Sequence, residues 1–404
     1  MCSINVAVKA LSATAFLALL LISLAGPSSV QDEFLTVLME PDGTGVWRDL
    51  VFRFNREHPG PAVHLIEGPP ATNTREDMYT TSFLSGGASY DIVYCDVIWI
   101  PKFVAAGWLL DLSDLISEQD RADYLPVELR AGSYQGRLYR MPAFTDAGVL
   151  YYRKDLVAHP PETFDELMQI ALRLKTNDRW GLLWQGKQYE GLITVYLEVL
   201  WGHGGEWIDD ESRKVLLGSP EAIRALEFLK ATIGTVSPPA VTTYIEEDTR
   251  SIFQNGRAVF LRNWPYVWTL IQRRGGPMKD QISVVPMVHA PRHSSAATLG
   301  GWGFAISKFC PNPQRAWQFV QFLTRPEQLR AVQQRQGRIP SRRNLIPAEF
   351  LSILDSARMR PRIPEYAQAS DILQRWLSAA LTGQVTPEEA LREAARETQL
   401  LLAS

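Results

Sequence analysis

The N-terminal third of the chain alternates short apolar runs with segments of helical periodicity. The pattern predicts strand, helix, strand, helix, strand and helix in turn over residues 34–39, 46–58, 62–67, 73–84, 91–95 and 99–106. Strands that alternate with helices of this length are typical of βαβ units and predict a mostly parallel sheet. In such sheets ligands bind beyond the carboxyl ends of the strands, which is where Glu40, Glu67 and Asp96 fall.

Helix start signals are found in the rest of the chain. Residues 163–166 and 386–389 both fit a capping box, and Ser219-Pro220 and Asn312-Pro313 each place proline at a first helical position. The sequence has no repeat of 20–50 residues, which argues against a solenoid or a propeller. No linker is long or polar enough to divide the chain, so we expect two lobes joined by several short crossings.

The N-terminus has the features of a secretory signal peptide. Lys9 precedes the uncharged apolar run 10–25, and small residues follow at 26–29. The run is short for a membrane span, which needs about 20 apolar residues. We therefore expect residues 1–30 to be a signal peptide, cleaved between residues 25 and 31, with an uncleaved anchor as the alternative. No cysteine lies near the cleavage position, which argues against a lipid anchor, and the mature protein is expected in the periplasm.

Composition and charge exclude several classes of function. The 404 residues carry 41 basic and 44 acidic side chains, and this formal charge of −3 disfavours a nucleic-acid partner. Cys2 lies in the signal peptide, and Cys95 and Cys310 are too few for a disulfide framework, so we expect a buried free thiol at Cys95. The six histidines lack metal-ligand spacing, and we expect neither a metal nor a cofactor.

Aromatic residues and carboxylates gather in a few short segments. Asp96 ends a predicted strand, Asp146 lies in a predicted loop before an apolar run, and Trp264 lies in the segment Arg-Asn-Trp-Pro-Tyr-Val-Trp. The Gly300-Gly301 pair before a tryptophan would let the backbone approach a ligand closely. Carboxylates accept hydrogen bonds from hydroxyls at roughly 1.5–3 kcal/mol each. Because aromatic faces also cover the apolar face of a pyranose ring, this combination favours a neutral polyhydroxylated ligand.

Each of these residues also has a purely structural interpretation. Asp96 could cap the helix that follows it, and Asp146 could form an Asx turn. Trp264 and Trp268 could be core residues, although Pro265 between them argues against a helix there. We assign four other tryptophans to packing, namely Trp47, Trp99, Trp108 and Trp317.

Taken together, longer segments resemble a known family. They are YRMPAFTDAGVLYYRKDL at 139–156, WQGKQYEGL at 184–192, RNWPYVW at 262–268, AATLGGW at 296–302, and Arg360-Pro361 followed by Tyr366 and Ser370. In this order they are similar to the solute-binding proteins of bacterial ATP-binding cassette (ABC) sugar importers, in the trehalose/maltose-binding branch. The resemblance spans nearly all of the mature chain.

The resemblance implies a two-lobe α/β periplasmic-binding-protein fold of type II, with the ligand cleft between the lobes. Lobe one would comprise residues 31–142 with 303–337, and lobe two residues 143–302 with 338–404. Residue by residue, the family's sugar contacts match two acids, three aromatic residues, one glycine in the same loop as the last of these, and two arginines: Asp96, Asp146, Trp264, Tyr266, Trp302, Gly301, Arg75 and Arg360.

Two departures from the family pattern fall on expected ligand contacts. Phe144 stands where relatives carry a tyrosine, and Gly43 stands about where relatives place an acid, with Glu40 close by. The resemblance therefore leaves the identity of the sugar open.

The implied function is not enzymatic. A monomer would bind a small α-glucoside, such as a trehalose- or maltose-type disaccharide or a glucosylated compatible solute, by hinge closure and deliver it to membrane permease subunits. One alternative is an exported glycoside hydrolase with Asp96 and Asp146 as its acid/base pair, although the βα pattern does not continue as eight units. Another is a binding protein for a polyamine or an iron chelate, which would want several convergent acids or paired tyrosines.

Overall fold

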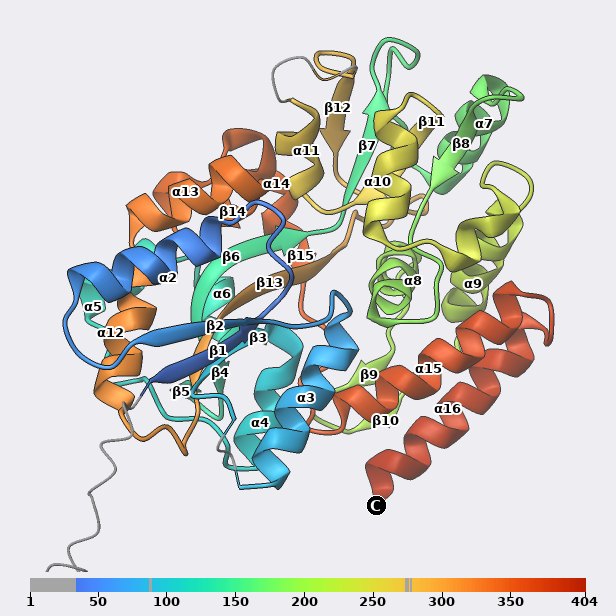
Figure 1. Ribbon diagram of the computed structural model, residues 1–404. Coiled ribbons are helices and arrows are strands. Elements are labelled where there is room, and N and C mark those ends of the chain that lie inside the picture. Colours follow the sequence, from blue (N-terminus) through green and yellow to red (C-terminus); the bar gives the residue numbers. More distant parts are fainter. Residues whose placement is uncertain (1–33, 87–88, 273–275, 277) are drawn as a thin grey trace, which may run out of the picture.

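The computed structural model describes residues 34–86, 89–272, 276 and 278–404. It is an α/β protein of two lobes (Figure 1). The predicted signal peptide over residues 1–30 lies outside the described residues. Within the described part of the chain, no helix combines the length and the apolar character needed to cross a bilayer.

The larger sheet belongs to the first lobe and is mixed rather than mostly parallel. In the described residues its strands follow the order β14-β6-β13-β3-β1-β2, with β15 beside β13. As predicted, β1 pairs in parallel with β2 and β3, but β13 is antiparallel to both β3 and β6 because it returns from the second lobe. The strands are β1 Leu35–Met39, β2 Val63–Glu67, β3 Ile92–Asp96, β6 Met141–Ala147, β13 Ala297–Ile306, β14 Ile339–Pro340 and β15 Ala357–Arg358.

Helices pack against this sheet and close the first hydrophobic core. They are α2 Val46–Glu57, α3 Thr72–Leu84, α4 Ile100–Ala105 after the short 3-10 helix η1 Val97–Trp99, α6 Pro126–Ala131, α12 Pro313–Leu323 and α13 Pro326–Gln336. The short helix α5 Glu118–Asp123 lies in the same lobe but has no buried residue. Trp47 and Trp99 are buried in this core, and Trp108 and Trp317 pack against it, which confirms their predicted packing role. A small hairpin joins β4 Ser133–Tyr134 to β5 Arg137–Leu138.

The second lobe is built on a smaller sheet of order β12-β7-β11-β8. Its strands are β7 Val149–Arg153, β8 Trp180–Leu183, β11 Ala258–Asn263 and β12 Ile282–Val285, and a separate hairpin pairs β9 Ile208–Asp209 with β10 Lys214–Val215. The surrounding helices are α7 Phe164–Leu174, α8 Glu190–Gly202, α9 Pro220–Thr232, α10 Glu246–Gln254, α11 Tyr266–Ile271, α14 Ala348–Asp355, α15 Tyr366–Leu381 and α16 Pro387–Ala403, with the short 3-10 turn η2 Pro239–Thr243. The 3-10 turn η3 Arg343–Leu345 follows β14 and belongs with the first lobe.

The helix start signals act largely as predicted. The Thr163 hydroxyl accepts from the Glu166 amide at 3.2 Å, and the Glu166 carboxylate accepts from the Thr163 amide at 3.3 Å, so this capping box is complete. Thr386 caps α16 through the Glu389 amide at 3.2 Å, which is one half of the predicted box. Ser219 and Asn312 also cap the helices that their following prolines begin.

Strands β6 and β13 run from the larger sheet toward the second lobe and are hydrogen-bonded to each other (Figure 1). Asp146 lies opposite Gly300 in this pairing, so the loop predicted around Asp146 is wrong. Gly301 and Trp302 likewise lie in β13 rather than in a loop. The ladder satisfies the backbone groups of two buried segments, which a loop at this depth would leave unpaired.

The segment after α13 lies with the larger sheet. Ile339 and Pro340 pair with β6, and Leu345 is part of the first core. The boundary predicted at 337/338 assigns these residues to lobe two, whereas their hydrogen bonds and packing place them with lobe one.

Gly301 in β13 has a backbone conformation and close neighbours that favour glycine. Its φ is +132°, and a Cβ there would lie 2.7 Å from the Phe144 carbonyl oxygen and 3.0 Å from Glu128 Oε1. We predict that Gly301→Ala lowers the free energy of unfolding by about 2 kcal/mol or more, because a strained backbone and a steric clash add. Urea unfolding checks this, with Gly43→Ala as the control, since a Cβ at Gly43 meets nothing within 4 Å. Equal midpoints for the two variants would contradict the prediction.

Candidate ligand-binding site

A cavity of about 510 Å³ lies between the two lobes. Its lining includes all eight residues that the sequence analysis gave as expected sugar contacts, namely Arg75, Asp96, Asp146, Trp264, Tyr266, Gly301, Trp302 and Arg360. The lining contains six carboxylates and four cationic side chains, which are Glu40, Asp96, Asp146, Glu190, Glu246 and Glu247 with Arg75, Lys187, Arg338 and Arg360. The structure therefore brings residues from distant parts of the chain to one polar cavity.

The first-lobe wall is formed by the end of β3 and the start of α3. Asp96 accepts from the Ile98 amide at 3.3 Å, so it also caps η1, as its structural interpretation predicted. The Arg75 guanidinium donates to the carbonyl oxygens of Pro69 and Pro70 at 2.7 and 2.8 Å. These bonds hold it with its Cζ 4.7 Å from the centre of the Trp302 ring.

Trp302 is held mostly by the protein itself. Its ring stacks on Tyr94 with 4.7 Å between centroids and meets Trp99 edge-on at 5.2 Å. Only 8% of Trp302 is exposed. Trp302 therefore lines the cavity but presents little free ring surface to a ligand.

Trp264 is the more open of the two nominated tryptophans. It is half-buried, and the Arg262 guanidinium lies over its ring at 4.3 Å. Its indole Nε1 donates to Glu246 Oε1 at 3.2 Å. Arg262 is fixed in turn by Glu198, which accepts from its Nε at 2.7 Å. Trp264 is thus a rigid aromatic surface at the edge of the cavity.

The sequence argument against a helix at this segment is wrong. Pro265 is the residue before α11, and the helix runs from Tyr266 through Trp268. A proline at a helix start loses no hydrogen bond, because its amide would be unpaired there in any case. The Tyr266 hydroxyl donates to Glu247 Oε1 at 2.6 Å, which orients this ring toward the cavity lining.

Arg360 links the two lobes. Its Nη1 donates to Glu190 Oε1 of α8 at 2.6 Å, and its Nη2 donates to Asp96 Oδ1 and to the Leu299 carbonyl at 3.4 Å each. Burial lowers the Arg360 pKa, but nearby Tyr366, Asp96 and Glu190 raise it by more, so the net direction is upward and the group stays charged. Ser370 holds the other oxygen of Glu190 at 2.6 Å.

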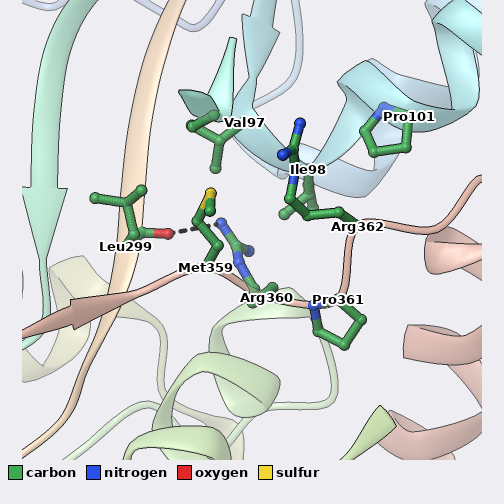
Figure 2. A pocket seen from close by; sticks show the side chains of 9 residues that line it. Val97, Ile98, Pro101, Leu299, Met359, Arg360, Pro361 and Arg362 are labelled. Atoms are coloured by element: carbon green, nitrogen blue, oxygen red, sulfur yellow. Dashed lines mark hydrogen bonds between the residues drawn. The ribbon is translucent and has the colours of Figure 1, made fainter. Parts of the chain in front are cut away.

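A small pocket shares Arg360 with the main cavity. Figure 2 shows residues 359–362 beside Val97, Ile98 and Pro101 of the first lobe, with Arg360 bonded to the Leu299 carbonyl. Ile98 packs against both the first and the second core. The segment around Arg360 is therefore a contact between the lobes as well as a wall of the cavity.

Asp146 lies at the floor of the cavity and is 4% exposed. Burial, the largest cause, raises the pKa of its carboxyl to about 7. Arg338 opposes this shift, while Glu128, Glu40 and Asp96 add to it. Asp146 Oδ2 lies 3.7 Å from Arg338 Nη1, and Asp146 Oδ1 has no hydrogen-bond partner among the described residues.

Several lining residues were not nominated from the sequence. Glu190 lies inside the WQGKQYEGL segment, which is one of the segments that resemble the family, so the sequence could have indicated it. Arg338 follows α13 and has no such motif around it. Glu40 lines the cavity and pairs with Arg338 at 2.9 Å. Glu67, at the end of the edge strand β2, does not line it.

The two departures from the family pattern also fall outside the lining. Phe144 is buried, with the Arg338 guanidinium over its ring at 4.7 Å, and neither it nor Gly43 lines the cavity. The expected ligand contact at Phe144 is therefore not supported. Phe144 could affect ligand binding only indirectly, through the position of Arg338.

The described residues contain no group of three or more histidine, cysteine or carboxylate side chains arranged to hold a metal. Cys95 is a buried free thiol, as predicted, and Cys310 is another.

The fold and the cleft define the class of protein, and comparisons with known proteins define the family. A family model described as bacterial extracellular solute-binding protein matches residues 40–329. The chain is 36% identical over 287 residues to a probable ABC transporter-binding protein of Deinococcus radiodurans, covering 68% of each chain. The chain therefore belongs to the bacterial extracellular solute-binding protein family.

Solved structures agree with this assignment. The maltose-bound MalE3 of T. maritima is 38% identical, with a TM-score of 0.85 over 91% of this chain and 99% of that one. A solute-binding protein of Thermotoga lettingae with bound α-D-tagatose is 26% identical, with a TM-score of 0.81 over 92% of this chain and 100% of that one. Both comparisons support the two-lobe fold across nearly the whole described chain.

The raised pKa of Asp146 gives a prediction about stability. Between its ordinary pKa of 3.8 and its folded value of about 7, the folded state binds more protons than the unfolded state, so this group lowers stability as pH rises through that range. We expect Asp146→Asn to be more stable than the wild type at pH 8, by a few kcal/mol in order of magnitude, and this gain to shrink toward pH 4.

Urea unfolding across pH 4–8 measures this difference. Asp111→Asn is the control, because hydrogen bonds with Ser113 and Arg137 outweigh desolvation and lower the pKa of the Asp111 carboxyl, so its loss brings no gain at pH 8. A stability gain for Asp146→Asn that does not change with pH would contradict the prediction.

Proposed function

We propose that the protein binds a small α-glucoside in the cleft between its lobes, in the periplasm, and delivers it to the membrane permease subunits of an ABC importer. The observation that carries this proposal is the cavity itself. A rigid, half-buried Trp264 stands beside carboxylates and guanidinium groups contributed by both lobes.

The chemistry of the lining favours a neutral polyhydroxylated ligand. Carboxylates accept hydrogen bonds from sugar hydroxyls, and guanidinium groups donate to the same hydroxyl oxygens. Because cations lie among the acids, the cavity presents no single dominant charge to an anion or a polyamine. The relatives' names point the same way, since they include a maltotriose-binding protein of Pyrococcus abyssi and the maltose-bound MalE3 of T. maritima.

Hinge closure is the mechanism that this geometry supports. A ligand in the cavity would contact β3 and α3 of lobe one and α8, α10 and α11 of lobe two. Because these contacts exist together only when the lobes are close, the ligand would bind the closed form more tightly and shift the population toward it. The closed monomer would then dock on the permease and release the sugar.

The hydrolase alternative is less consistent with the site. Asp96 is already engaged by Arg360 and by the Ile98 amide, which leaves it poorly placed as a general acid or base. The named relatives are binding proteins rather than enzymes.

Titration with trehalose, maltose, sucrose and glucosylglycerol separates these functions. The proposal expects saturable binding of at least one of them, seen as a rise in unfolding temperature, without release of glucose. Glucose release at enzymatic rates would establish the hydrolase instead, and binding of a polyamine with no response to any glucoside would establish the non-sugar alternative.

Trp264, which lines the cavity, supplies a direct test of the site. We predict that Trp264→Ala weakens binding of the best glucoside at least ~30-fold, because the variant lacks the aromatic surface that this residue presents to the cavity. Calorimetric titration is the measurement. Trp268→Ala is the matched control, since Trp268 is also half-buried in the same segment but does not line the cavity, and we expect its affinity to stay within about threefold of wild type. Similar losses in both variants would show that Trp264 is not a ligand contact.

A further inference from the structure

Two charged groups at the floor of the cavity face each other without making a hydrogen bond. Arg338 Nη1 and Asp146 Oδ2 are 3.7 Å apart, which is too long for a direct bond. Asp146 Oδ1 is buried and has no hydrogen-bond partner in the described part of the chain. A buried carboxylate oxygen without a partner is costly, so its environment is complete only when another group bonds to it.

Arg338 is held in place by groups from both lobes. Its Nη2 donates to Glu40 Oε1 at 2.9 Å, just beyond the end of β1. Its Cζ lies 4.7 Å from the centre of the Phe144 ring in lobe one and 5.4 Å from that of Tyr266 in lobe two. These contacts fix the guanidinium plane and leave Nη1 on the side of Asp146.

The hydrogen-bonding requirements of this pair are met by a hydroxyl group. An oxygen atom at about 2.8 Å from each partner can bond Arg338 Nη1 and Asp146 Oδ2 at once, because two such bonds span the 3.7 Å between these two atoms. The oxygen must accept from the guanidinium and donate to the carboxylate. A hydroxyl does both through a single atom, whereas an ether oxygen or a fluorine can only accept.

We propose that Arg338 and Asp146 together recognise one hydroxyl of the bound saccharide, with Glu40 as the residue that positions Arg338. This inference rests on the proposed function and adds a specificity rule to it. The site requires a free hydroxyl at one position of the sugar and rejects analogues in which that hydroxyl is deleted or blocked. Lysine would not replace Arg338, because a single ammonium group cannot hold Glu40 and the ligand in the same fixed geometry.

The test is a series of maltose analogues, each lacking one hydroxyl, titrated calorimetrically at pH 8. We expect one deletion to weaken binding to the wild-type protein at least ~30-fold, since it removes the bonds that Arg338 Nη1 and the Asp146 carboxylate make to that hydroxyl. In Arg338→Met the same deletion should cost at least about threefold less than in the wild type, because the hydroxyl then has only its bond to Asp146 to lose. Arg343→Met is the matched control, since Arg343 is exposed on the following segment and does not line the cavity, and it should keep the wild-type penalties.

A second variant tests the same assignment if Arg338→Met fails to fold. Glu40→Gln keeps Arg338 but weakens its anchor, and it should give an intermediate penalty for the same hydroxyl and for no other. Deletion penalties that are identical in the wild type and in both variants would overturn the assignment of Arg338 while leaving glucoside binding intact. Failure of the wild-type protein to bind maltose or any other glucoside would instead overturn the proposed function, and this assignment with it.

Discussion

The antiparallel pairing of β6 with β13 determines where the binding residues lie. This ladder places Asp146 opposite Gly300, and the pairing of β13 with β3 places Trp302 opposite Asp96. Residues that lie opposite each other in a sheet point to the same face, so acids and aromatic rings from separate segments meet there. Gly300 has no side chain, and a Cβ at this position would lie 3.2 Å from both the Trp264 ring and the Asp146 Cβ. The missing side chain leaves room for Trp264 and Asp146 on either side of this position.

Behind each wall of the cavity lies a fully buried ion pair. Arg140 donates to Glu128 at 2.8 Å in the first lobe, and Arg262 donates to Glu198 at 2.7 Å in the second. Burying such pairs costs desolvation energy that their attraction only partly offsets, so their value here lies in position rather than stability. Arg262 supports the ring of Trp264 from below, and burial raises the pKa of Glu128, the carboxylate next to Gly301. The site is therefore held in place before a ligand arrives.

Much of the fold followed from local sequence signals. The first three strands and their helices, the capping box at Thr163 and the two-lobe α/β class were all predicted, since periodicity and caps are local properties. The antiparallel return of β13 was missed, because nothing in residues 297–306 records which strands lie beside them. The loop expected around Asp146 was wrong for the same reason, since only tertiary pairing turns that segment into a strand.

The residues of the site were also predicted in part. The eight nominated residues came from motifs that resemble a known family, and the structure gathers all of them around one cavity. The motifs did not predict which charged residues pair with one another in the cavity. Arg338 follows a helix in an unremarkable polar stretch, and its proximity to Glu40 and Asp146 exists only in three dimensions.

The site described above would hold a saccharide between the lobes against Trp264, with one hydroxyl bridging Arg338 and Asp146. A crystal structure of the protein with its best-binding glucoside tests this most directly. We expect a sugar ring against Trp264, with one hydroxyl oxygen within hydrogen-bond distance of both Arg338 Nη1 and the Asp146 carboxylate. A glucoside bound outside this cavity, or bound inside it without contact to Arg338 and Asp146, would show that these residues do not form the binding site.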